Sequence, residues 1–159
     1  MTAWRRCRLI RLRQPGDEEA IVDLVRTELV PLSPRPGMHG SRLRKEIDAR
    51  LRRGVTLVAS RTPRSEPFAF LHMEIRQRTL FVDLLAVSAS AQNRRWGSML
   101  MAAAEQYGAS RGCTEARLFV DDTNERGLRF YAKLGYSAVR HISGAYCYEL
   151  VKPLAARWS

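Results

Sequence analysis

A polar passage at residues 85–98 carries residue types that suit anion binding. It leads from an apolar stretch, typical of a strand, into a helical pattern, so free backbone N–H groups gather where the helix dipole favours negative charge. Gly97 would permit close approach of a phosphate, and Arg94 and Arg95 add positive charge beside it. The passage has neither G-x-x-x-x-G-K-[ST] nor G-x-G-x-x-G, the usual nucleotide loops. It indicates either another kind of phosphate site or an ordinary turn between a strand and a helix.

A second group of polar and aromatic residues occupies positions 121–136. Asn124 begins a short helix that we expect to end at Gly135, a residue suited to a helix C-terminus. Tyr131 lies within this helix at helical spacing from Leu128. It is either a core aromatic or a proton donor, because a phenol with an unperturbed pKa of about 10 keeps its proton at neutral pH. Phe130 and Tyr136 are expected in the core.

The cysteines and histidines do not form a metal-binding pattern. No C-x-x-C pair is present, and no two histidines lie within helical or turn spacing of one another, so we expect no metal. Cys113 and Cys147 fit buried positions in or beside strands. The sequence also shows no apolar run approaching the roughly 20 residues of a membrane span and no apolar segment after its basic start. These features predict a cytoplasmic protein.

The elements that must position these residues follow from hydrophobic periodicity. Alternation predicts strands at residues 8–13, 55–60, 68–76, 79–87, 115–121, 136–141 and 145–152. Helical spacing predicts helices at about 17–29, 41–53, 96–110 and 124–134, with Ser41 as the cap of the second helix. Three prolines make residues 31–37 a loop. We therefore predict one α/β domain over residues 1–159, with a mixed, mostly antiparallel sheet, helices on both faces and a central parallel βαβ unit formed by the strands at 79–87 and 115–121.

The charge of the chain favours an anionic partner. Its 159 residues include 27 Lys+Arg against 16 Asp+Glu, a net charge of +11, and all but three of the basic residues are arginine. Nucleic acid is one candidate partner, because residues 41–53 form a basic helix. Against this reading, the sequence has no helix-turn-helix or zinc pattern and no aromatic run of the RNA-binding type. Most of the arginines fit a solvated surface.

The two polar passages together resemble the GNAT N-acetyltransferase superfamily. The carrying patterns are Asn-x5-Phe-Tyr-x-Lys-x-Gly-Tyr, beginning at Asn124, and Gln-x-x-x-x-Gly, beginning at Gln92. The second pattern departs from that of the family, since Arg95 stands where its first loop glycine is expected. A positive φ at Arg95 would cost about 1–2 kcal/mol. The resemblance implies an enzyme that transfers an acetyl group from acetyl-CoA, as co-substrate, to a primary amine by direct attack in a ternary complex, with homodimerisation common.

The resemblance also implies a set of coenzyme-binding residues. The backbone of residues 85–87 would contact the pantetheine arm, the Val87 N–H would stabilise the acetyl oxygen, and Tyr131 would protonate the leaving thiolate. Asn124 would hold the pantetheine arm, and Arg126 would join the pyrophosphate site. The full set is Leu85, Ala86, Val87, Gln92, Asn93, Arg94, Arg95, Trp96, Gly97, Ser98, Asn124, Arg126 and Tyr131.

A base must take the proton of the attacking amine, and two carboxylates are candidates. Period-two alternation places Phe81, Asp83, Leu85 and Val87 on one strand face, which favours Asp83 as the base. Glu74, on the preceding strand, is the alternative. Asp83 could instead form a structural hydrogen bond near the centre of its strand. His72, on the strand of Glu74, is expected to be a hydrogen-bonded or exposed side chain.

Two questions stay open from the sequence. One is whether the chain catalyses turnover or, with Arg95 in its loop, binds acyl-CoA as a sensor. The other is the identity of the acceptor, which in this superfamily is chosen by the region between the first two helices and by the last hairpin. His39 and Arg42 lie in or beside the first of these regions, and their charge favours an acceptor with a carboxylate or phosphate.

Overall fold

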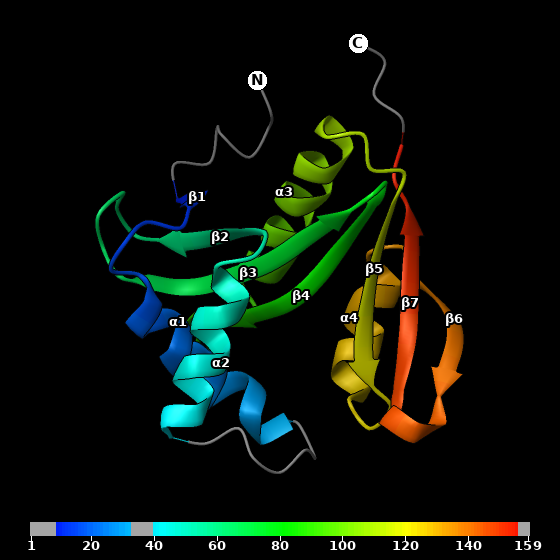
Figure 1. Ribbon diagram of the computed structural model, residues 1–159, viewed down its shortest axis with the longest axis horizontal. Coiled ribbons are helices and arrows are strands. Elements are labelled where there is room, and N and C mark those ends of the chain that lie inside the picture. The colour runs from blue at the N-terminus through cyan, green and yellow to red at the C-terminus, as the bar shows by residue number, and fades with distance from the viewer. Residues whose placement is uncertain (1–8, 33–39, 156–159) are drawn as a thin grey trace.

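The computed structural model describes residues 9–32 and 40–155 and shows a seven-stranded sheet in the order β1-β2-β3-β4-β5-β7-β6 (Figure 1). The strands are β1 (Ile10–Leu12), β2 (Val55–Ser60), β3 (Pro67–Arg76), β4 (Thr79–Val87), β5 (Glu115–Asp121), β6 (Ser137–Ile142) and β7 (Cys147–Pro153). The helices are α1 (Glu18–Leu24), α2 (Ser41–Leu51), α3 (Trp96–Ser110) and α4 (Glu125–Lys133). Only β4 and β5 pair in parallel; every other neighbouring pair is antiparallel. The predicted mixed sheet with a central parallel unit is confirmed.

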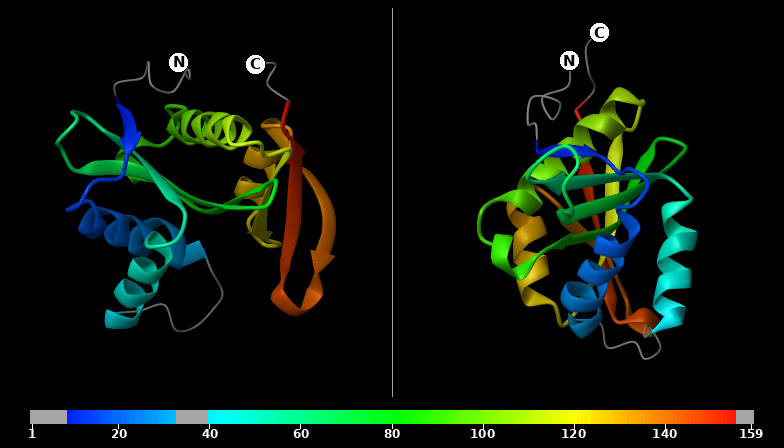
Figure 2. Two further views of the ribbon diagram at one scale, coloured as in Figure 1. Left: turned by 45° about the horizontal axis from the view of Figure 1, so that its top comes forward. Right: turned by 90° about the vertical axis from the view of Figure 1, so that its left-hand side faces the viewer.

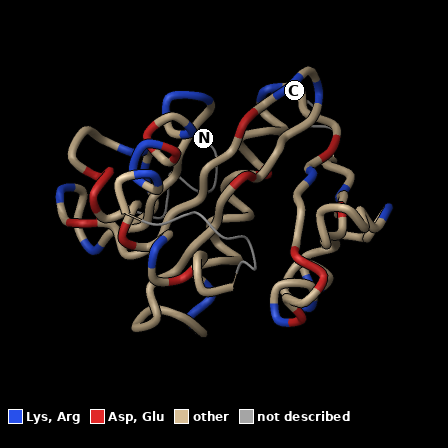
Figure 3. The backbone as a smooth tube through the Cα atoms, turned by 60° about the horizontal axis from the view of Figure 1, so that its bottom comes forward, with Lys and Arg blue, Asp and Glu red and all other residues tan. Residues whose placement is uncertain are grey.

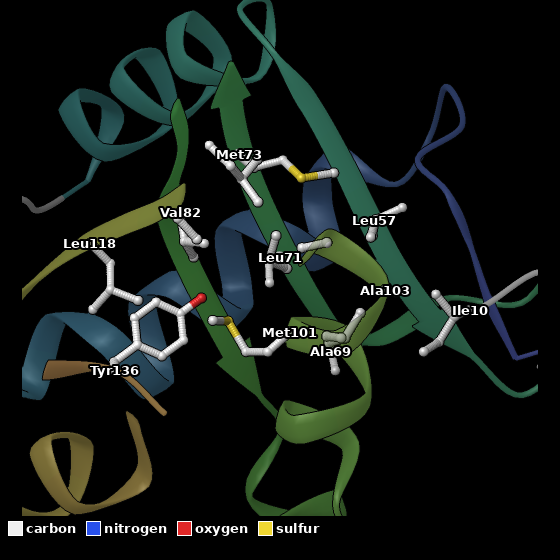
Figure 4. Close-up of a cluster of buried hydrophobic side chains, with 14 of the residues drawn as sticks. Ile10, Leu57, Ala69, Leu71, Met73, Val82, Met101, Ala103, Leu118 and Tyr136 are labelled. Carbon is white, nitrogen blue, oxygen red and sulfur yellow. The ribbon is translucent and has the colours of Figure 1, made fainter. Parts of the chain in front are cut away.

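Helices cover the sheet on both faces, as predicted, and each face has its own apolar core (Figure 2). On one face α3 and α4 pack over a cluster that draws on all the central strands, including Leu71, Val82 and Leu118 (Figure 4). On the other face α1 and α2 enclose a smaller cluster around Val58, Phe70 and Ala86. The sheet therefore separates two apolar clusters, and the position of a residue along β4 decides which of the two clusters its side chain faces.

Helix α2 buries one stripe of its surface against the sheet. Leu43, Ile47 and Leu51 are spaced four residues apart and are each at most 5% exposed, while the intervening basic residues face solvent. The expectation that Ser41 caps this helix is wrong. Gly40, with a φ of +63°, occupies the cap position, and Ser41 is the first helical residue.

The end of α1 differs from a simple helix. A five-residue π-helical segment, η2 (Val25–Leu29), follows α1 directly, and a short 3-10 turn, η3 (Val30–Leu32), follows η2. Pro31 therefore lies in helical geometry, which corrects the prediction of a loop from this residue. A proline is tolerated there because the turn is only three residues long. Residues 33–39, including His39, lie outside the described residues.

A β-bulge interrupts the pairing of β4 with β3. His72 pairs with Leu84 and Met73 with Val82, which leaves Asp83 as an extra residue on β4. Val82 therefore packs in the α3 cluster, but after the bulge Leu85 and Val87 pack there instead of the even-numbered residues. Asp83 contacts Arg50 of α2 on the opposite side. The prediction that Asp83 shares a face with Leu85 and Val87 is wrong, because it assumed uninterrupted alternation.

His72 is fully buried beneath α2. Its Nδ1 lies 2.8 Å from the Thr56 hydroxyl, and no described residue accepts or donates a hydrogen bond at its Nε2. Burial lowers the pKa of His72 below the usual 6.5, and the carboxylates of Asp83 and Glu74 only partly oppose this. The ring is thus neutral in the fold, and it lacks the full set of partners that the sequence suggested.

This burial makes stability depend on pH. Between about pH 6.5 and the lower pKa of the folded state, His72 is protonated in the unfolded chain and neutral in the folded chain. The unfolding free energy should therefore decrease as the pH decreases, by at most about 1.4 kcal/mol per pH unit from this group. Urea unfolding at several pH values between 5 and 7 measures that slope. In His72→Gln the contribution should vanish; an unchanged slope would assign the pH dependence to other groups.

Candidate active site

Strands β4 and β5 pair over only part of their length. The parallel register runs from Thr79–Glu115 to Phe81–Arg117, just three residue pairs. Beyond Phe81, β4 continues alongside β3 to Val87, while β5 continues alongside β7 to Asp121. The two strands therefore diverge towards their carboxyl ends, and the second half of β4 loses its neighbour on one edge (Figure 1). This is the edge on which both polar passages of the sequence begin.

The backbone of β4 presents hydrogen-bonding groups to this opening. Ser88 N–H donates to the Phe68 carbonyl at 2.8 Å, which makes Ala69 and Val87 a non-hydrogen-bonded pair of the antiparallel ladder. The N–H and C=O groups of Val87, and by the same alternation those of Leu85, point away from β3 towards the gap. Ala86 is turned the other way, to Phe70. Of the three residues predicted to contact a pantetheine arm, Leu85 has both backbone groups and Val87 its N–H group available for it, while the Val87 carbonyl accepts from Gln92 Nε2 at 2.9 Å.

The loop from β4 to α3 forms a cradle of N–H groups. Asn93 and Arg95 both have left-handed φ values, +62° and +67°, and this alternation turns successive N–H groups towards one side. Among the described residues, none accepts a hydrogen bond from the N–H groups of residues 93–95, and no side chain caps α3. The first helical bond comes from Met99 to Arg95. Trp96, Gly97 and Ser98 thus also present N–H groups, which together suit an anion.

Arg95 holds the strained conformation that its sequence position suggested. Replacing it with glycine should remove this cost, so Arg95→Gly should raise the unfolding free energy by about 1 kcal/mol and Tm by roughly 2–4 °C. Arg95→Ala removes the same guanidinium but keeps a Cβ, and should bring no such gain. Thermal unfolding of the two variants separates backbone strain from charge. Equal Tm values for both would contradict a strain at this position.

Three guanidinium groups surround the loop. Arg126 of α4 donates to Gln92 Oε1 and to Asn93 Oδ1, each at 3.4 Å. Arg94 lines a cavity of about 260 Å³ together with Arg61 and Trp96. Within the described part of the chain, none of Arg94, Arg95 and Arg126 pairs with a carboxylate. No carboxylate of the described residues therefore compensates their charge, and Arg126 is held against the loop by its contacts with Gln92 and Asn93.

Nine of the sixteen other arginines in the described part of the chain contact a carboxylate. Arg11, Arg13, Arg44, Arg50, Arg117 and Arg140 each contact one or more carboxylates, and basic and acidic stretches adjoin along the backbone (Figure 3). Carboxylates therefore neutralise the arginines in some parts of the surface and not in others. The β4–α3 loop is one place where guanidinium groups lack them.

Gly97 brings α3 close to α4. A Cβ at this position would lie 3.2 Å from the Phe130 ring, so the glycine serves helix packing as well as any approach of a ligand. Phe130 in turn meets Tyr131 edge to face, with the ring centroids 5.0 Å apart. The loop and the α4 aromatics are therefore packed into one unit.

Tyr131 is partly buried against the α3 cluster between two other rings. Its centroid lies 5.0 Å from that of Phe130 and 5.8 Å from that of Tyr136. Burial raises the pKa of Tyr131 to about 12, so the hydroxyl stays protonated at neutral pH. Among the described residues no partner binds this hydroxyl, whereas that of Tyr136 donates to Glu105 at 3.0 Å. Tyr136 is in the core as predicted, and Tyr131 keeps a proton that no described side chain engages.

Asn124 has a structural role that the sequence analysis did not identify. It is the N-cap of α4, and its Oδ1 accepts the Gly127 N–H at 2.9 Å. An asparagine just before a helix is the usual signal for such a cap. The predicted contact with a pantetheine arm would have to use the remaining Nδ2 group.

The two candidate bases occupy different places relative to the opening. Asp83 lies two residues beyond the last β4–β5 pair, where the strands diverge, and its Oδ1 is 3.3 Å from Arg50 Nη1. Glu74 is paired with Phe81, still within the closed part of the sheet, and contacts Arg76 at 3.3 Å. Asp83 therefore lies nearer than Glu74, along the strands, to the gap between β4 and β5, which favours Asp83 as the candidate base.

Glu28 belongs to this site although the sequence analysis overlooked it. From η2 its carboxylate accepts the Ala89 N–H at 3.1 Å and the Gln92 Nε2–H at 3.0 Å. These partners are more than 60 residues away in the chain. Local spacing carries no signal of such a contact. Of the remaining candidates, Arg42 is exposed on α2, and Cys113 and Cys147 are buried as predicted.

Among the helices of the described ranges, none has the length and apolar character of a membrane span.

Similar folds occur among solved structures. The ribosomal-protein-S18-alanine N-acetyltransferase from Escherichia coli is 14% identical, with a TM-score of 0.75, covering 94% of this chain and 96% of its own. An aminoglycoside 6'-N-acetyltransferase complexed with coenzyme A is 18% identical, with a TM-score of 0.77, covering 94% and 99%. The PaiA N-acetyltransferase from Thermoplasma acidophilum, in complex with coenzyme A, is 20% identical, with a TM-score of 0.70, covering 91% and 98%.

Comparison with curated proteins finds no match. The family described as Acetyltransferase (GNAT) family matches residues 21–136, which include η2, the diverging strands, the β4–α3 loop and α4. These are the elements that build the opening and its N–H cradle. The chain belongs to the GNAT acetyltransferase family.

Proposed function

We propose that the protein transfers an acetyl group from acetyl-CoA to a primary amine. The observation that carries the proposal is the divergence of β4 from β5, which frees the backbone of Leu85 and the N–H of Val87 beside a cradle of N–H groups. An extended pantetheine arm matches a strand edge, and a pyrophosphate matches the cradle and its guanidinium groups. The solved relatives that hold coenzyme A support this donor.

Each residue then has a distinct task. The Val87 N–H would donate to the oxygen of the thioester, on which negative charge develops during attack. Tyr131 holds the proton needed by the departing thiolate, and its raised pKa of about 12 keeps that proton in place. Asp83, on the face of α2, would take the proton of the amine directly or through one water. The amine attacks the carbonyl carbon, the C–S bond breaks, and no covalent enzyme intermediate is needed.

Calorimetry with coenzyme A and acetyl-CoA tests the donor. A panel of amines, neutral, anionic and cationic, incubated with acetyl-CoA while free thiol is followed, tests the transfer. We expect binding in the micromolar range and thiol release with at least one amine class. Absence of binding at tens of micromolar would refute the proposal. Binding without thiol release from any amine would favour an acyl-CoA sensor, the reading that Arg95 in the loop first suggested.

A further inference from the structure

We propose that Glu28 is a positioning residue that holds the β4–α3 loop ready for the pyrophosphate of coenzyme A. The inference rests on the proposed function. The carboxylate uses one oxygen for Ala89 N–H and the other for Gln92 Nε2–H. Ala89 is the first residue of a 3-10 turn, η4 (Ala89–Ala91), and Gln92 directly follows it, so Glu28 holds both ends of that turn. The cradle at residues 93–95 begins directly after it.

The contact also fixes the side-chain amide of Gln92. Its Nε2 faces two acceptors, Glu28 Oε2 at 3.0 Å and the Val87 carbonyl at 2.9 Å. Both N–H groups are thereby used, and the amide can have only one orientation. Gln92 Oε1 must then point away from Glu28, where it accepts from Arg126.

A continuous chain of hydrogen bonds therefore crosses the site. It runs from Glu28 in η2 through Gln92 to Arg126 in α4, and Arg126 returns to the loop at Asn93 Oδ1. The place of the Arg126 guanidinium thus depends on a carboxylate from a different element. Glu28 lies in a π-helical segment, a rare geometry that is frequent at functional sites.

Two effects of Glu28 on an anionic ligand oppose each other. Its negative charge repels a pyrophosphate, while its hydrogen bonds order the loop that would bind one. Glu28→Gln removes the charge and keeps one acceptor oxygen, whereas Glu28→Ala removes both. If positioning dominates, alanine weakens binding more than glutamine does. If repulsion dominates, both variants bind more tightly.

The test compares calorimetric Kd values for coenzyme A in the wild type, Glu28→Ala and Glu28→Gln. Asp23→Ala is the matched control, because the one ion pair of the Asp23 carboxylate among the described residues is an exposed contact with Arg26, three residues on, at 2.6 Å. We expect Glu28→Ala to raise Kd about tenfold, consistent with a lost charge-assisted hydrogen bond, with a smaller rise for Glu28→Gln and none for Asp23→Ala. The ratio of the Glu28→Ala Kd to the wild-type Kd should be the same for dephospho-coenzyme A, because this ligand retains the pyrophosphate.

Two further readouts distinguish positioning from general destabilisation. In turnover, Glu28→Ala should raise KM for acetyl-CoA and leave kcat nearly unchanged. In combination with Arg126→Ala, its effect on Kd should be less than additive, because both act through Gln92. Binding by Glu28→Ala as tight as in the wild type, or tighter, would overturn this inference alone. Failure of the wild type to bind coenzyme A would overturn the proposed function and the inference together.

Discussion

Tyr131→Phe is expected to lower kcat by about 10²- to 10³-fold while changing the affinity for coenzyme A by less than about twofold. The reason is that the variant removes one proton donor and leaves the ring. The ring supplies the packing against Phe130 and Tyr136, at 5.0 and 5.8 Å, so the fold should be preserved. Steady-state kinetics with the best amine, together with calorimetry, measures both quantities.

Tyr136→Phe provides the matched control for this substitution. It removes a hydroxyl from a neighbouring ring, but that hydroxyl is engaged with Glu105 in the core. We expect a loss of stability of about 1 kcal/mol from the broken hydrogen bond and little change in kcat. Turnover by Tyr131→Phe at the wild-type rate would remove Tyr131 from the role of acid and return it to the core aromatics.

Asp83→Asn is the substitution with the second largest expected effect. Loss of a base should lower kcat/KM by about 10²-fold at neutral pH and remove the ascending limb of the pH–rate profile that the carboxylate controls. Asparagine can still accept a hydrogen bond from Arg50, so the contact at 3.3 Å need not be lost. The measurement is kcat/KM across pH for the variant and the wild type.

Glu74→Gln is the natural comparison, because it neutralises a second carboxylate on the preceding strand. Glu74 pairs with Phe81 in the part of the sheet where β4 and β5 are still joined, so we expect it to leave the profile unchanged. If Glu74→Gln removes the ascending limb and Asp83→Asn does not, the role of base passes to Glu74. If neither does, a water chain takes the proton.

Hydrophobic periodicity was enough to locate nearly every element. The stripe of Leu43, Ile47 and Leu51 marked α2, and the strands at 55–60, 79–87 and 115–121 match the observed bounds. Strand–helix–strand order then predicted the parallel pairing of β4 with β5. These features depend on the spacing of apolar residues within each segment, and that spacing can be read from a single sequence.

Features that depend on contacts between distant segments were not predicted. Nothing near Asp83 marks the bulge, because the extra residue is visible only when Val82 and Leu84 are seen paired with the adjacent residues Met73 and His72 of β3. The contact of Glu28 with Ala89 likewise joins elements that only the folded chain brings together. Arg95 is an intermediate case, since its departure from a family glycine suggested the positive φ that the structure shows.

The bulge at Asp83 also affects how related sequences must be aligned along this strand. The register of the first half of β4 is fixed by its hairpin with β3, and that of the last residues by the hydrogen bond of Ser88 with Phe68 and by the loop. A homologue without the bulge would need a one-residue gap here for both ends to be aligned correctly. Without that gap, the carboxylate position or the Val87 position would be assigned to the wrong neighbour. Deleting Asp83 would restore regular pairing, with Val82 and Leu84 as neighbours opposite Met73 and His72, and would leave the last residues of β4 on their present sides of the sheet.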